Sequence, residues 1–193
     1  YTQNATINDV TFAISGHPAV TNATSTTFYG VTVTGDMEVS NNNGAFVTYA
    51  VPKLDSSNAL TRSVELTFNN CTADVTMLGG GASNNYNAVF VGYAYGNGKT
   101  SDEKTITTTT TLNFTNCVNE GRLICGKAAL FLGNNSANNG IVNINVTNCT
   151  NNGFIRAAYA DYTWDPFVAT GTHTNNHVTL NNASVTDPDS EDV

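Results

Sequence analysis

The sequence predicts an all-β protein, built as a right-handed parallel β-helix (a solenoid) of about four to five coils with three short strands per coil. Two observations carry this prediction: a strand-and-turn pattern that recurs along the chain, and a composition poor in charge. Only 11% of the residues are charged, against roughly 25% in an ordinary globular domain. Asn, Thr and Gly take the place of charged residues, and this polar, β-branched composition favours strands and turns over helices.

The recurring pattern alternates apolar and polar residues and then ends at Asn-Cys. It occupies residues 66–71, 112–117 and 142–149, and residues 178–183 repeat it with Ala in place of Cys. Aligning Val33, Phe68, Phe114, Val146 and Leu180 gives steps of 35, 46, 32 and 34 residues. A repeat of this length, with Gly and Asn turns between short strands, is typical of solenoid proteins.

In a parallel β-helix each coil lies on the one before, so equivalent residues form ladders about 4.8 Å apart. The alignment predicts two inward ladders of apolar side chains. Their members are Leu66, Leu112, Ile144 and Val178 in one, and Phe68, Phe114, Val146 and Leu180 in the other. A β-sandwich is the alternative fold, but the Asn-Gly hairpin turns that would favour it are few.

The Asn that precedes each Cys is the next residue of the alternation and is expected to face inward at a turn. Asn tolerates the left-handed backbone conformation, and stacked Asn amides can hydrogen-bond along a ladder. This ladder would contain Asn70, Asn116, Asn148 and Asn182. Of the four cysteines, Cys71, Cys117 and Cys149 share one repeat position and are expected to be buried small hydrophobes. A disulfide between Cys117 and Cys125 is the alternative.

Three segments are expected along the chain: an N-terminal cap or degenerate coil (1–30), the β-helix repeats (31–185) and an acidic linker (186–193). Loops are expected at 51–62, 94–104 and 159–165. The expected strands are 31–35, 37–39 and 45–49; 64–68, 74–78 and 88–93; 112–117, 121–125 and 128–133; 142–149, 154–158 and 167–169; and 177–185.

The charge distribution argues against two classes of partner. The formal net charge is −8, and the seven Lys and Arg residues are scattered singly. Nucleic acids and anionic membranes are bound by clustered cations, which this chain lacks. No apolar run approaches the roughly 20 residues of a membrane-spanning helix. We therefore expect no nucleic-acid partner and no membrane insertion.

No motif in the sequence points to catalysis. Asp74 and Glu120 occupy matching positions on adjacent repeats and resemble a carboxylate pair, but Arg122 offers Glu120 a simple ion pair. Asp36-x-Glu38 is a weaker candidate of the same kind. His173 and His177 are four residues apart in a strand-rich stretch, which is not the helical metal-binding arrangement. The sequence therefore predicts no enzyme activity, no cofactor and no metal site.

Aromatic residues in the insertions are better candidates for a binding site. Exposed Tyr and Trp provide large contact areas for proteins and sugar rings at low entropic cost. The alternative is that the rings fold back over the flank of the helix. The predicted ligand-binding residues form two groups, Tyr86, Tyr93 and Tyr95 around one loop and Tyr159, Tyr162 and Trp164 in another.

The chain also resembles a known class of repeat. Asn70-Cys71-Thr72, a Gly-rich stretch and then Ala88-x-Phe90-Val91-Gly92 resemble the Cys- and Gly-containing repeats of large surface proteins from gut Gram-positive bacteria. Phe90-Val91-Gly92 and Phe131-Leu132-Gly133 are similar to the Gly-Leu-x-Gly repeats of such proteins. The resemblance covers residues 31–185. It implies an adhesin-like protein at the bacterial cell surface or secreted, which attaches to a host protein, immunoglobulin being one candidate, or to a glycan.

Together these observations predict a non-catalytic binding module, a monomeric domain of a larger extracellular chain, that attaches to a host protein through aromatic loops. Two alternatives remain open: a β-helix that binds or degrades polysaccharide, and a structural stalk.

Overall fold

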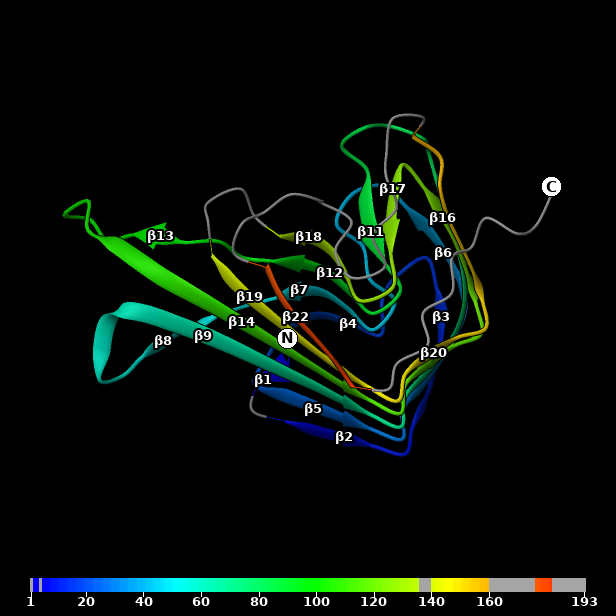
Figure 1. Cartoon of the computed structure of the whole chain (residues 1–193), viewed down its shortest axis with the longest axis horizontal. Coiled ribbons are helices and arrows are strands. Elements are labelled where there is room, and N and C mark those ends of the chain that lie inside the picture. The colour runs from blue at the N-terminus through cyan, green and yellow to red at the C-terminus, as the bar shows by residue number, and fades with distance from the viewer. Residues whose placement is uncertain (1, 4, 136–139, 160–175, 182–193) are drawn as a thin grey trace.

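The computed structural model describes residues 2–3, 5–135, 140–159 and 176–181. Every regular element in these ranges is a β-strand, which confirms the all-β prediction. The strands pair in parallel, apart from the two antiparallel pairs β8–β9 and β13–β14. In Figure 1 the colour of the second sheet advances from blue at β2 to orange-red at β22, so strands from successive parts of the chain are neighbours.

The chain runs repeatedly through three sheets, and each passage contributes a strand to each sheet in turn. The first sheet has the order β1-β4-β7-β12-β18. Its strands are β1 (Thr2–Gln3), β4 (Val20–Thr24), β7 (Val47–Ala50), β12 (Val91–Ala94) and β18 (Leu132–Asn135).

The second sheet of each passage is the longest and has the order β2-β5-β9-β14-β19-β22. Seven consecutive residues of β14 pair with β19 without a gap, from Thr109–Ile141 to Thr115–Thr147. Its strands are β2 (Thr6–Asn8), β5 (Thr26–Tyr29), β9 (Asn58–Asn69), β14 (Thr105–Thr115), β19 (Ile141–Thr147) and β22 (Asn176–Asn181).

The third sheet completes each passage. A short fourth pair, β11 (Tyr86–Ala88) with β17 (Lys127–Ala129), lies between the third and first sheets along the chain. The strands of the third sheet are β3 (Thr11–Ser15), β6 (Thr32–Val39), β10 (Thr72–Gly79), β15 (Val118–Asn119), β16 (Arg122–Cys125), β20 (Thr150–Asn151) and β21 (Phe154–Ala157).

Phenylalanine rings form two columns at the centre of the core. Phe68 stacks between Phe28 and Phe114, with ring centroids 4.9 and 4.8 Å apart and planes within 8° of parallel. A second column, Phe46, Phe90 and Phe131, packs edge-on against it, as Phe46 on Phe68 at 5.7 Å shows. All of these rings are buried. Both predicted ladders exist from Leu66 and Phe68 onward, because these residues pair in register with Leu112 and Phe114.

The alignment of Val33 with Phe68 is wrong. Val33 pairs with Ala73, and the residue in register with Phe68 is Phe28. The stretch from residue 31 therefore supplies the third-sheet strand of a passage that has already begun, and it does not start a new passage. Alternating apolar residues occur in both kinds of strand, so the pattern gave no means of telling them apart. Strands of residues 1–30 join the same three sheets as the later ones.

The turn before each third-sheet strand is a ladder of left-handed residues. Asn70, Asn116 and Asn148 each have φ near 53°, as predicted, and Asp9 and Gly30 occupy the same position with φ of 48° and 64°. The Nδ2 of Asn116 donates to Oδ1 of Asn70 at 3.0 Å. These Asn side chains are exposed, not inward-facing, because the left-handed turn rotates them out of the strand alternation. Asn182 lies outside the described residues.

Two expected loops contain additional strand. β8 (Lys53–Asp55) folds back on the first half of β9, where 51–62 was expected to be loop. β13 (Gly98–Lys99), within 94–104, pairs with the start of β14. Figure 1 shows both excursions extending to the same side of the molecule. The Thr-rich run 105–111 and the residues before Val64 have enough β propensity to lengthen the second sheet on that side.

Candidate functional site

Three tyrosine rings gather on the first sheet and the segment that leaves it. Tyr49 of β7 and Tyr93 of β12 are cross-strand neighbours, with ring centroids 6.0 Å apart. Tyr95 meets Tyr93 edge-on at 5.1 Å and Tyr49 at 6.3 Å. Tyr95 is exposed and the other two are half-buried. None of the three belongs to the packed core, so this tyrosine cluster (Tyr49, Tyr93, Tyr95) is an accessible aromatic surface.

The segment after Tyr95 is fastened to the extended part of the second sheet. Arg62 donates from Nη2 to the carbonyl oxygen of Gly96 at 2.8 Å and from Nε to Oγ1 of Thr108 at 2.7 Å. Thr108 in turn donates from Oγ1 to the same Gly96 oxygen and from its backbone N to Oδ1 of Asn97, both at 2.8 Å. These contacts fix the position of Tyr95. Burial, followed by the neighbouring Tyr93 and Tyr49, raises the pKa of Tyr95.

A second aromatic group surrounds a lysine. Lys127 lies beside Tyr86 across the β11–β17 pair, and its Nζ donates to the Tyr86 hydroxyl at 3.3 Å. The same ammonium lies 4.7 Å from the centre of the Tyr86 ring and 5.5 Å from that of Tyr159. Both rings are half-buried. Cation–π contact of this kind stabilises the group internally, which leaves it less free to bind a partner.

The structure thus regroups the predicted site residues. Tyr93 and Tyr95 lie together, as predicted, but Tyr86 belongs with Tyr159 and not with them. Tyr49 was not among the predicted ligand-binding residues. Its position could have been found, because Phe46-Val47-x-Tyr49-Ala50 repeats the pattern Phe90-Val91-x-Tyr93-Ala94 around Tyr93. Tyr162 and Trp164 lie outside the described residues.

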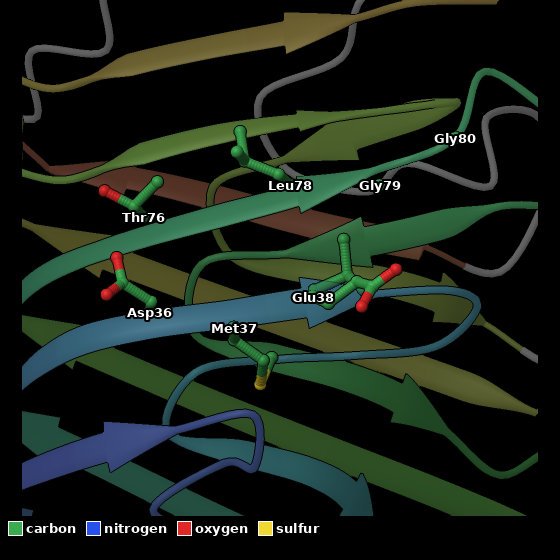
Figure 2. Close-up of a pocket in the computed structure, with 8 residues that line it drawn as sticks. Asp36, Met37, Glu38, Thr76, Leu78, Gly79 and Gly80 are labelled. Carbon is green, nitrogen blue, oxygen red and sulfur yellow. The ribbon is translucent and has the colours of Figure 1, made fainter.

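A shallow groove lies on the outer face of the third sheet. It has a volume of about 560 Å³ and is lined by residues from the ends of β6 and β10. Figure 2 shows Asp36 and Glu38 on one strand beside Thr76 and Leu78 on the next. Gly79 and Gly80 also line the groove, and the groove stays open beside them because they have no side chains. The groove holds two carboxylates and an exposed leucine, but no ring.

Of the other acidic candidates, Glu120 is bound by an amide of the next passage. Glu120 accepts a hydrogen bond from Nδ2 of Asn152 at 2.8 Å. The expected ion pair of Glu120 with Arg122 is wrong, because the Arg122 guanidinium lies over the ring of Phe154, 5.0 Å from its centre. In the described part of the chain the structure has no group of three or more His, Cys, Asp and Glu side chains that could hold a metal ion. His173 lies outside that part, and of His177 only the strand position is described.

The cysteines are all buried free thiols, so the alternative of a Cys117–Cys125 disulfide is wrong. The backbone N of Cys117 donates to Sγ of Cys149 at 3.4 Å, and Sγ of Cys117 donates to the Phe68 oxygen at 3.3 Å. Hydrogen bonds with Cys149 and Cys71, together with burial, raise the pKa of Cys117. Burial raises that of Cys125 to about 11. Cys117 and Cys125, protonated and enclosed, therefore support packing and are poor nucleophiles.

Outward-facing amides on the second sheet satisfy one another. Asn145 donates from Nδ2 to Oδ1 of Asn113 at 2.8 Å, and Asn113 donates to Glu65 at 2.9 Å. The side chains of this ladder form hydrogen bonds to one another across neighbouring passages, and these bonds help to hold the passages together.

No family model, curated protein or solved structure matches this chain. Within the described residues, no helix is long and apolar enough to cross a membrane.

Proposed function

We propose that this chain is a non-catalytic binding module of an extracellular bacterial surface protein, and that it attaches to a host protein through the tyrosine cluster. The observation that carries the proposal is the packing of Tyr49, Tyr93 and Tyr95 outside the core. Three accessible rings within 6.3 Å of one another match the aromatic anchors that dominate protein–protein interfaces.

The scaffold that we propose for this site is a right-handed parallel β-helix. The repeated passage through three parallel sheets, and the residue-by-residue stacking of passages, support it. The right hand follows from the strong preference of parallel crossover connections. Such a scaffold holds Tyr49 and Tyr93 at a fixed spacing, which lowers the entropic cost of binding.

The arrangement of the rings favours a protein ligand over a sugar. Sugar rings bind to a flat aromatic face with polar groups beside it, whereas Tyr93 and Tyr95 meet at 89° and cover each other's edges. An angled cluster fits a protruding apolar side chain better than a sugar plane. Polysaccharide binding by the outer Asn ladder is less well supported, since Asn113 and Asn145 are engaged with each other. The resemblance to surface-protein repeats makes immunoglobulin the first ligand to test.

The test is a quantitative binding assay against immunoglobulin and against serum and mucus proteins. We expect the triple variant Tyr49→Ser, Tyr93→Ser, Tyr95→Ser to bind at least about tenfold more weakly than the native chain. The matched control is Tyr29→Ser, which removes an exposed tyrosine from β5, outside the cluster. Far-UV circular dichroism and the melting temperature should be the same for both variants.

If the triple variant keeps native affinity for a captured partner, the tyrosine cluster is not the site. In that case Tyr86 and Tyr159, and then Tyr162 and Trp164, are the next groups to substitute. Release of reducing sugar from a glycan panel would establish the polysaccharide-degrading alternative instead. Absence of any captured partner would leave the structural stalk.

A further inference from the structure

The outer face of the third sheet carries two cross-strand rows whose chemistry changes from one end to the other. In the first row Asp36, Thr76, Arg122 and Phe154 are consecutive partners on β6, β10, β16 and β21. In the second row the partners are Glu38, Leu78, Ile124 and Arg156. Both rows begin with a carboxylate, and cations occupy the far half of each.

The carboxylates and the arginines of these two rows form no ion pairs within the described part of the chain. In the part of the chain that the structure describes, the one ion pair joins Lys99 and Glu103, far from this face. Asp36, Glu38 and Arg156 are exposed. The Arg122 guanidinium leans along its row onto Phe154, so both cations gather towards the β21 end. The face is therefore acidic at β6 and basic at β21.

The middle of the second row is apolar. The side chain of Leu78 is 48% exposed, one of the few large hydrophobic residues so open to solvent. It borders the groove that Gly79 and Gly80 leave open, and a Cβ on Gly79 would overlap the backbone oxygen of Val39. Ile124, its neighbour across the strands, is half-buried. An apolar centre between opposite charges is the composition of a docking surface.

We propose that this face binds the same face of a second copy of the chain, related by a two-fold axis that runs along the strands between β10 and β16. That operation lays β6 of one copy over β21 of the other and reverses the order of each row. Glu38 then faces Arg156 of the other copy, and Leu78 faces Ile124. Asp36 faces Phe154, over which the other copy's Arg122 lies. Self-complementarity under a two-fold axis is what a symmetric dimer requires.

The same geometry limits the affinity. Four strand positions about 4.8 Å apart, each about eight residues long when β15 and β20 are counted with β16 and β21, give a face of roughly 500 Å² per copy, at the small end of specific interfaces. A third row lies two residues before the first row along each strand and contains Asp74 of β10. There Asp74 falls opposite the Glu120 region of the other copy, and these like charges repel. The dimer is therefore weak, with a dissociation constant on the order of 10 µM or higher. At lower concentrations the chain is a monomer, as the sequence predicts.

Sedimentation velocity of the full chain across a concentration series tests the dimer. We expect the native chain to shift to the dimer at tens to hundreds of micromolar. Glu38→Lys alone and Arg156→Glu alone should each weaken association at least about tenfold, because each places like charges opposite one another twice. An equimolar mixture of the two variants should associate again, since both pairs formed by residues 38 and 156 are then opposite in charge. Asp74→Asn should strengthen association.

Asp102→Lys is the matched control, because it makes the same charge change as Glu38→Lys on an exposed residue outside this face. It should leave association unchanged. Leu78→Ser, which alters no charge, should weaken it. The proposal is overturned if the native chain stays monomeric at several hundred micromolar, if Glu38→Lys associates like the native chain, or if the mixture of folded variants does not associate.

Discussion

Two aromatic groups of this protein differ in one respect that decides what each can do. The phenylalanine columns lie inside the three sheets, and Phe68 has 0% of its surface exposed. The tyrosine cluster lies outside them, with Tyr95 38% exposed. Both groups arise from stacking of equivalent residues on successive passages. The inner group is part of the packed core, whereas the outer group lies outside it.

The difference follows from which face of a strand the ring occupies. Phe68 is flanked by parallel rings on both sides and touched edge-on by a third, so its removal leaves a cavity that rigid neighbours cannot fill. Tyr95 is flanked by two tyrosines and by solvent. Its removal leaves only a lost contact.

The largest expected effect is that of Phe68→Ala. We expect it to lower the free energy of unfolding by about 3 to 5 kcal/mol, the cost of a large cavity in a close-packed core. Urea denaturation followed by circular dichroism measures it. A loss below about 1 kcal/mol would mean that the columns are loosely packed, and the contrast with the tyrosine cluster would disappear.

Alkaline pH should destabilise the buried interior. The pKa of Cys125 rises from about 9 to about 11 on folding, because burial disfavours the thiolate. A group whose pKa is raised contributes its full stability below the unfolded value and loses it as the pH rises through the folded value. Stability should therefore fall between pH 9 and 11, by at most roughly 2 to 3 kcal/mol for this thiol. Urea midpoints at several pH values should show a shallower fall for Cys125→Ala.

The left-handed turn ladder lies between the two groups in expected effect. Asn116→Ala should cost about 1 to 2 kcal/mol, because a Cβ without a compensating polar group is strained at φ of 53°. Asn116→Gly relieves that strain but still removes the hydrogen bond to Asn70. Comparison of the two variants by urea denaturation separates backbone strain from the amide ladder. Equal losses would assign the whole effect to the hydrogen bond.

The smallest expected effect on stability is that of Tyr95→Ala, which we place within about 0.5 kcal/mol of the native chain. Thermal and urea unfolding measure it alongside Phe68→Ala. A loss comparable to that of Phe68→Ala would show that the tyrosine cluster is structural, and would remove the main support for the proposed binding site.

The sequence by itself determined the two apolar ladders from Leu66 and Phe68 onward and the left-handed turn that follows them. Leu66 and Phe68 are in register with Leu112 and Phe114, and a one-residue slip between these passages would turn both apolar sets outward. The left-handed Asn was foreseeable from the same repeat, since Asn is one of the few side chains that tolerates that conformation.

Only the tertiary structure decided which passages begin where and which side chains meet outside the core. Val33 and Phe28 both satisfy an apolar pattern, and only the pairing with Ala73 and Phe68 separates them. Tyr49 contacts Tyr95, and Lys127 contacts both Tyr86 and Tyr159. These contacts join residues from different passages. Local sequence fixes a strand's period and turn chemistry, whereas lateral neighbours depend on how the passages stack, and the surface formed there is where we place function.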